Sequence, residues 1–155
     1  MEDVGQKVNE TIQMRINNSD ALCVAKFEPT RDWRVHAMIG RRRHLHAGKV
    51  LLAFLPPQVQ EQMLPDQLGR FTPRTITRRS KLAAELQAIR QAGHCISRGE
   101  FSEQLVSTAV PVLAFDGSVI ADLNIAAPGF RTEGRPAAFV LLLKDAAQKI
   151  SKGLG

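Results

Sequence analysis

Cysteine is scarce in this 155-residue sequence, which contains only Cys23 and Cys95. The two lie far apart and show no CxxC spacing, so we expect no disulfide framework and a reducing, cytoplasmic location. Long apolar runs are also missing, because no stretch reaches the roughly 18 residues that a membrane-spanning helix needs. The first residues, MEDVGQKVNETIQ, carry acidic groups and no apolar segment, so we expect no signal peptide. We therefore expect a cytoplasmic protein with no membrane partner.

Neither an internal repeat nor a low-complexity linker divides the chain. Its length suits one domain, and an apolar fraction of 44% suits a globular core. We therefore predict a single domain over residues 1–155. The formal net charge of +6 suggests anionic partners, but it does not distinguish nucleic acid from acidic ligands.

Helix and strand patterns alternate along the chain. Period-2 alternation and turn residues predict strands over 10–16, 21–27, 31–40, 104–115 and 118–127. Apolar runs and a 3.6-residue period predict helices over 2–10, 49–55, 58–64, 78–94 and 135–152. For the helix over 78–94 we expect Thr77 or Ser80 as the N-terminal cap and Gly93 as the C-terminal cap. Asp116 and Gly117 predict a tight turn between the last two strands. The pattern predicts an α+β domain built on an antiparallel sheet.

The strand over 118–127 carries polar residues on one face only. Because side chains alternate along a strand, one face is apolar and includes Leu123 and Ile125. The other face includes Asp122, Asn124 and Ala126. The first face belongs to the core. The second face is either in contact with solvent or lines a small polar cavity.

Some residues of this sequence suggest one of three other functions. For each, an ordinary structural role of the same residues is better supported. His94 and Cys95 suggest a thiol nucleophile, but neighbouring residues of a strand point to opposite faces. His36, His44 and His46 suggest a metal site, but their spacing matches no standard zinc pattern. Two basic stretches, at 41–43 and 74–81, could contact phosphate, but no nucleic-acid recognition motif accompanies them. We expect no catalytic residues, no metal and no cofactor.

Six segments in order resemble one known family. They are LHAGKVLLAFLP, FTPRTIT, LAAELQAIRQAGH, ISRGEFSE, STAVPVLAFDGSVIADLNIAAPGFR and LLLKDAAQKISKGLG. Together they resemble the C-terminal effector-binding domain of IclR-type bacterial transcription factors. The resemblance implies a GAF-like antiparallel sheet, flanked by N-terminal, middle and C-terminal helices, that binds a small effector, commonly an organic or aromatic acid.

The resemblance also implies partners. Family members form homodimers and tetramers, and a winged helix-turn-helix domain that precedes this one contacts DNA. We expect that DNA-binding domain to be absent from this chain, and effector binding to control DNA affinity through rearrangement of the oligomer. The alternative is a GAF-like small-molecule-binding or enzymatic domain unrelated to transcription.

The family's effector site maps onto particular residues of this chain. The positions that the resemblance implies are Ala47, Gly48, Ser97, Leu105, Ser107, Asn124 and Ala126. Asp122 shares the strand face of Asn124, and we include it in the predicted site. Many relatives have a small residue there, and a carboxylate would repel an anionic effector unless it is protonated or paired.

The loop before the helix over 49–55 is shorter than in relatives, which usually have a few more small residues between LHA and the lysine. Two readings follow. Either the pocket is open, or the chain is interrupted between Gly48 and Lys49, and the close match of the flanking segments favours the interruption.

Overall fold

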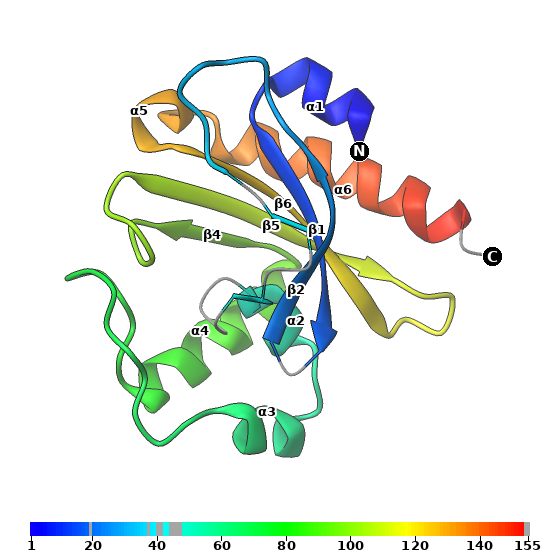
Figure 1. Ribbon diagram of the computed structural model, residues 1–155. Coiled ribbons are helices and arrows are strands. Elements are labelled where there is room, and N and C mark those ends of the chain that lie inside the picture. Colours follow the sequence, from blue (N-terminus) through cyan, green and yellow to red (C-terminus); the bar gives the residue numbers. More distant parts are fainter. Residues whose placement is uncertain (19, 37, 40–41, 44–47, 154–155) are drawn as a thin grey trace.

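The computed structural model describes the whole chain except residues 19, 37, 40–41, 44–47 and 154–155. Within the described residues, a six-stranded antiparallel sheet has the order β3-β2-β1-β6-β5-β4 (Figure 1). Its strands are β1 (Thr11–Asn18), β2 (Asp20–Phe27), β3 (Arg42–Arg43), β4 (Cys95–Arg98), β5 (Leu105–Leu113) and β6 (Val119–Pro128). The helices are α1 (Glu2–Val8), α2 (Lys49–Ala53), α3 (Pro57–Met63), α4 (Arg79–Ala92), α5 (Gly129–Thr132) and α6 (Pro136–Gly153). The predicted α+β class with an antiparallel sheet is confirmed.

One face of the sheet packs against α1 and α6. From β6 it contributes Ala121, Leu123 and Ile125, the parity predicted as core. The apolar stripe of α6 meets this face through Phe139, Leu143 and Ala146, all buried. Burying one large apolar side chain is worth about 1.5–3 kcal/mol, so this layer supplies much of the stability.

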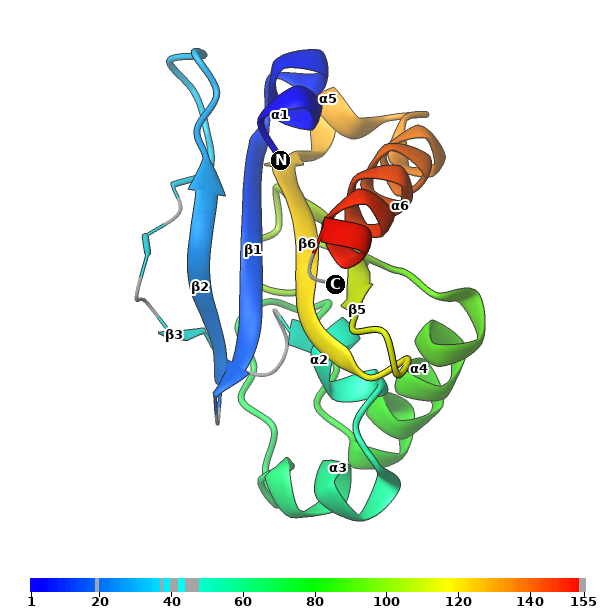
Figure 2. The same cartoon turned by 90° about the vertical axis from the view of Figure 1, so that its right-hand side faces the viewer.

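The opposite face packs against α2 and α4, which lie in the lower part of Figure 1. Leu82, Leu86 and Ile89 of α4 are buried there, as their spacing predicts. Figure 2 shows α3 continuing the chain between α2 and α4 at the end of the molecule away from α1. Helices cover only part of this face, and the uncovered part holds the cavity described below.

Two predicted turns are confirmed. Gly93 ends α4 in the left-handed conformation, with φ of 68°, and its amide donates to the Ile89 carbonyl at 2.8 Å. At the β5–β6 hairpin, Gly117 has φ of 82°, and the Asp116 carboxylate accepts a hydrogen bond from the Ser118 amide at 2.9 Å. Both glycines occupy conformations that other residues rarely adopt.

The predicted N-terminal cap of α4 is wrong. The helix begins after Arg78, and no side chain caps it. Neither Thr77 nor Ser80 therefore supplies the expected hydrogen bond, and the helix depends on its buried apolar stripe instead.

The strand predicted over 31–40 is also wrong. Its described residues form no strand, and the next strand along the chain is Arg42–Arg43, which pairs with β2. Side chains satisfy the backbone carbonyls here: Thr11 donates to the Val35 carbonyl at 2.5 Å, and Arg131 donates to the Trp33 carbonyl at 2.9 Å. Because these partners replace a neighbouring strand, apolar alternation alone misassigned the segment.

Gly48 is the N-cap of α2, and Lys49 follows it directly as the first residue of the helix. The interruption expected between these two residues stays a prediction. A Cβ atom on Gly48 would lie 2.8 Å from the Ala21 Cβ, so glycine permits the close approach of α2 to β2.

Candidate functional site

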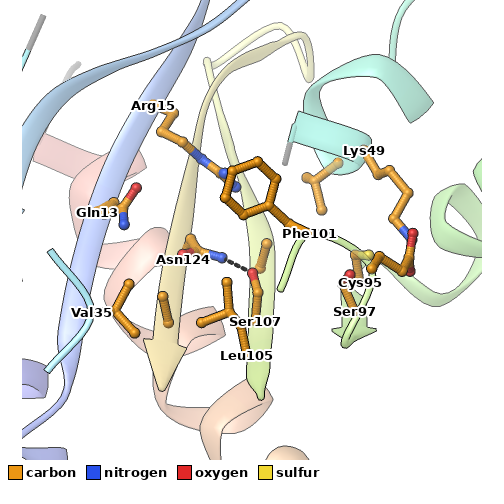
Figure 3. A pocket seen from close by; sticks show the side chains of 14 residues that line it. Gln13, Arg15, Val35, Lys49, Cys95, Ser97, Phe101, Leu105, Ser107 and Asn124 are labelled. Atoms are coloured by element: carbon orange, nitrogen blue, oxygen red, sulfur yellow. Dashed lines mark hydrogen bonds and ion pairs between the residues drawn. The ribbon is translucent and has the colours of Figure 1, made fainter. Parts of the chain in front are cut away.

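A cavity of about 50 Å³ lies on the sheet face that α2 partly covers. Its walls come from β1, β4, β5, β6, the start of α2 and the loop after β4 (Figure 3). Five predicted site residues line it: Ser97, Leu105, Ser107, Asn124 and Ala126. These residues therefore lie together as predicted, although their role in binding stays a prediction.

Asn124 and Ser107 form the polar floor of the cavity. They lie on the paired strands β6 and β5, and the Asn124 amide nitrogen donates to the Ser107 hydroxyl (Figure 3). Asn124 is only 1% exposed. Because no described residue bonds the Asn124 amide oxygen or accepts the Ser107 hydroxyl proton, this pair can both accept from and donate to a ligand.

Asp122 does not line the cavity, which corrects its assignment as an effector contact. It is fully buried, and Arg15 stands directly opposite it on β1. The Arg15 Nε and Nη2 atoms donate to the two carboxylate oxygens at 2.9 and 2.7 Å. Burial raises the pKa of Asp122, and the Arg15 guanidinium opposes that rise. Asp122 is thus a paired carboxylate whose partner is Arg15.

Arg15 itself lines the cavity, although it is not among the residues predicted for the site. It is 3% exposed, and Figure 3 shows its side chain extending from β1 toward the other labelled residues. Asp122 occupies Nε and Nη2, which leaves Nη1 with no hydrogen bond to any residue that the structure describes. A cationic donor fixed in a buried cavity is suited to bind a carboxylate.

Lys49 and two glutamates form a second charge group, in which Lys49 and Glu100 are buried and Glu85 is partly exposed. The Lys49 ammonium donates to Glu100 at 2.6 Å and to Glu85 at 2.9 Å. Burial tends to lower the pKa of Lys49, but Cys95 and the two carboxylates outweigh it, so the pKa of Lys49 is raised. The sequence offered one signal for this group: a lysine that opens an otherwise apolar helix.

The two remaining predicted site residues are Gly48 and Ala47. Gly48 packs against Ala21 and does not line the cavity. Ala47 lies outside the described residues, as do His44 and His46. Among the described residues, no group of three histidine, cysteine or acidic side chains could hold a metal ion. In the same part of the chain, no helix combines the length and apolarity that crossing a membrane requires.

Cys95 also lines the cavity, but its thiol is not activated. Burial raises the pKa of Cys95 to about 11. The adjacent His94 ring contacts the Ala92 carbonyl, with its Nδ1 at 3.1 Å. At neutral pH the thiol is therefore protonated and unsuited to nucleophilic attack.

We predict that iodoacetamide at pH 8 labels Cys95 about a hundredfold more slowly than it labels glutathione. The reason is that the thiolate forms only as the pH rises toward the raised pKa. Peptide mass spectrometry after timed quenching measures the rate. Labelling of Cys95 as fast as glutathione would show that the thiol is ionised or exposed.

The sheet with helices on both faces and a cavity on one of them defines a small-molecule-binding domain. The chain matches the family model "Bacterial transcriptional regulator IclR C-terminal" over residues 1–152. It is 31% identical to the HTH-type transcriptional regulator KipR of Bacillus subtilis, covering 100% of this chain and 64% of that protein. It is also 31% identical to the transcriptional repressor AllR of Escherichia coli, covering 97% of this chain and 56% of that protein.

The chain therefore belongs to the IclR family of bacterial transcriptional regulators and corresponds to their C-terminal effector-binding domain. It spans between about half and two thirds of the length of these curated relatives. This is a family of regulators and not of enzymes, so the alternative of a domain unrelated to transcription is not supported.

Solved structures agree with this assignment. The C-terminal domain of E. coli KdgR superimposes with a TM-score of 0.85 at 34% identity, covering 98% of this chain and 92% of that chain. The inducer-binding domain of PobR from Acinetobacter, a double mutant in complex with 3-hydroxybenzoic acid, has a TM-score of 0.83 at 31% identity, covering 96% and 91%. An IclR homologue from Microbacterium hydrocarbonoxydans, complexed with 4-hydroxybenzoate, has a TM-score of 0.89 at 28% identity, covering 98% and 63%.

Proposed function

We propose that this chain is a single effector-binding and oligomerisation domain of a cytoplasmic regulator, and that its effector is a small organic or aromatic acid. The observation that carries the proposal is Arg15, which lines the cavity. Asp122 binds its Nε and Nη2 atoms, and none of the residues that the structure describes bonds its Nη1 atom. The hydroxybenzoates bound by two structural relatives support the same class of ligand.

The size of the cavity limits how an aromatic acid could bind. Its volume of about 50 Å³ is smaller than the roughly 150 Å³ of a cavity that accepts benzene. A neighbouring groove of about 340 Å³ shares Val35, Phe101 and Leu105 with the cavity. We propose that the effector places its carboxylate near Arg15 and extends past Phe101 toward this groove. Smaller aliphatic acids would fit without such an extension.

Effector binding then acts on DNA indirectly. In a homodimer or tetramer, a ligand that prefers one arrangement of the subunits shifts the population toward it. DNA would be contacted by a separate winged helix-turn-helix domain of the regulator. The basic residues of the present chain have no groove-reading element beside them among the described residues.

Mass spectrometry of small molecules retained through purification tests the proposal and identifies the effector in the same experiment. We expect the wild-type chain, purified under native conditions and then denatured, to release a small organic acid in near-stoichiometric amount. The Arg15→Met, Asp122→Leu double variant, which replaces the buried pair with apolar side chains, should release none. Absence of any acid from the wild-type chain, together with failure to bind the acids used below, would contradict the proposal.

A further inference from the structure

The Glu100 carboxylate lines the cavity with only one of its two oxygens bonded. Oε1 accepts the hydrogen bond from Lys49 at 2.6 Å. Oε2 is buried and has no hydrogen-bond partner among the residues that the structure describes, and the whole residue is 9% exposed. Buried polar atoms are almost always hydrogen-bonded, and this oxygen can accept a hydrogen bond from a ligand bound in the cavity.

The backbone around Glu100 is held in place by a distant segment. Thr72 donates to the Gly99 carbonyl at 2.5 Å, and Thr75 donates to the Glu100 carbonyl at 2.6 Å. Gly99 adopts φ of 69°, a conformation that suits glycine. Because the threonines fix the backbone and Lys49 fixes one oxygen, the other oxygen has a defined position before any ligand arrives.

The cavity thus offers two unmatched groups of opposite kind. Arg15 presents a cationic donor and Glu100 presents an anionic acceptor, while Asp122 and Lys49 already neutralise their charges. A simple carboxylic acid would satisfy Arg15 and leave Glu100 unpaired beside a second anion. An acid that also carries a hydroxyl or N–H group can satisfy both.

We infer that Glu100 is a specificity-determining residue that selects effectors carrying a hydrogen-bond donor in addition to the acid group. This inference rests on the proposed function, because it concerns the same cavity and the same class of ligand. A site that loses a charge-assisted hydrogen bond disfavours the analogue lacking the donor by about tenfold or more.

Matched pairs of acids test this inference on the wild-type chain. The probes are glycolate against acetate, and 3- and 4-hydroxybenzoate against benzoate, each titrated by calorimetry. We expect at least one hydroxylated acid to bind about tenfold or more tightly than its partner. If acids bind but no hydroxylated member is preferred, the inference is wrong and the proposed function survives. If no acid binds, the inference is contradicted, and so is the proposed function if the wild-type chain also retains no acid through purification.

Two variants then assign the preference to Glu100. Glu100→Gln keeps the shape of the side chain and removes its charge, and we expect it to reduce the preference to about threefold or less, while the unhydroxylated acid binds at least as tightly as before. Glu103→Gln makes the same charge change at an exposed position of the same loop and should leave the preference intact. A preference that persists in Glu100→Gln would assign selectivity to another residue. The wild-type comparison decides the inference even if Glu100→Gln does not fold.

Discussion

Replacing Asp122 with alanine is expected to lower the free energy of unfolding by about 3–5 kcal/mol. The change leaves the Arg15 guanidinium buried without its partner, and an uncompensated buried charge is strongly destabilising. Asp122 is fully buried and Arg15 is 3% exposed, so solvent does not compensate the loss. Urea unfolding monitored by circular dichroism measures the change, provided that the slope of the transition is unchanged.

The Arg15→Met, Asp122→Leu double variant should recover most of that stability, because apolar side chains often replace a buried ion pair without loss. As a surface control, Glu28→Ala removes the exposed Lys26–Glu28 ion pair, whose atoms lie 2.7 Å apart, and should not shift the urea midpoint. If Asp122→Ala unfolds at the same urea midpoint as the wild-type chain, the Arg15–Asp122 pair is not buried in solution.

Replacing Asn124 with leucine is expected to weaken effector binding by at least about tenfold while the fold is retained. The two side chains are similar in size, but leucine removes the amide that bonds Ser107 and faces the cavity. A ligand polar group that loses its partner in a buried site carries a penalty of about 1–3 kcal/mol.

Calorimetry with 4-hydroxybenzoate or glycolate, whichever the wild-type chain binds more tightly, measures this loss. Ile120→Leu, an exposed change on the same strand, serves as the control and should bind like the wild type. Unchanged affinity in Asn124→Leu would place the effector outside this cavity.

The period of β6 is sufficient to predict one wall of the cavity. Leu123 and Ile125 face the core, and Asn124 and Ala126 face the cavity, as alternation along one strand requires. The same rule applied to β1 places Gln13 and Arg15 on the cavity face. The apolar residues of β1 alternate with polar ones. The apolar set predicts the core face, and the polar set predicts that Gln13 and Arg15 lie on the opposite face.

The partner of Asp122 cannot be read from the sequence. Arg15 and Asp122 are separated by 107 positions, and they meet only because β1 pairs with β6 in a particular register. Register depends on the whole sheet and its hairpins, so the same carboxylate could equally have faced a ligand or a cation.

Glu100 is beyond prediction for a different reason. Its position depends on a loop with a positive φ at Gly99 and on hydrogen bonds from Thr72 and Thr75, which lie about 25 residues earlier. The segments FTPRTIT and ISRGEFSE each resemble the family on their own. Their contact, which orients the carboxylate, is a tertiary feature that neither segment shows alone.

A crystal structure of the chain with 4-hydroxybenzoate tests most directly whether Arg15 binds the acid group of the effector. We predict that the carboxylate of the ligand lies within about 3.2 Å of the Arg15 Nη1 atom, with Arg15 still paired to Asp122. We also predict that the aromatic ring lies against Phe101, between the cavity and the neighbouring groove. A ligand bound elsewhere, or bound in the cavity with its carboxylate turned away from Arg15, would contradict the proposed function.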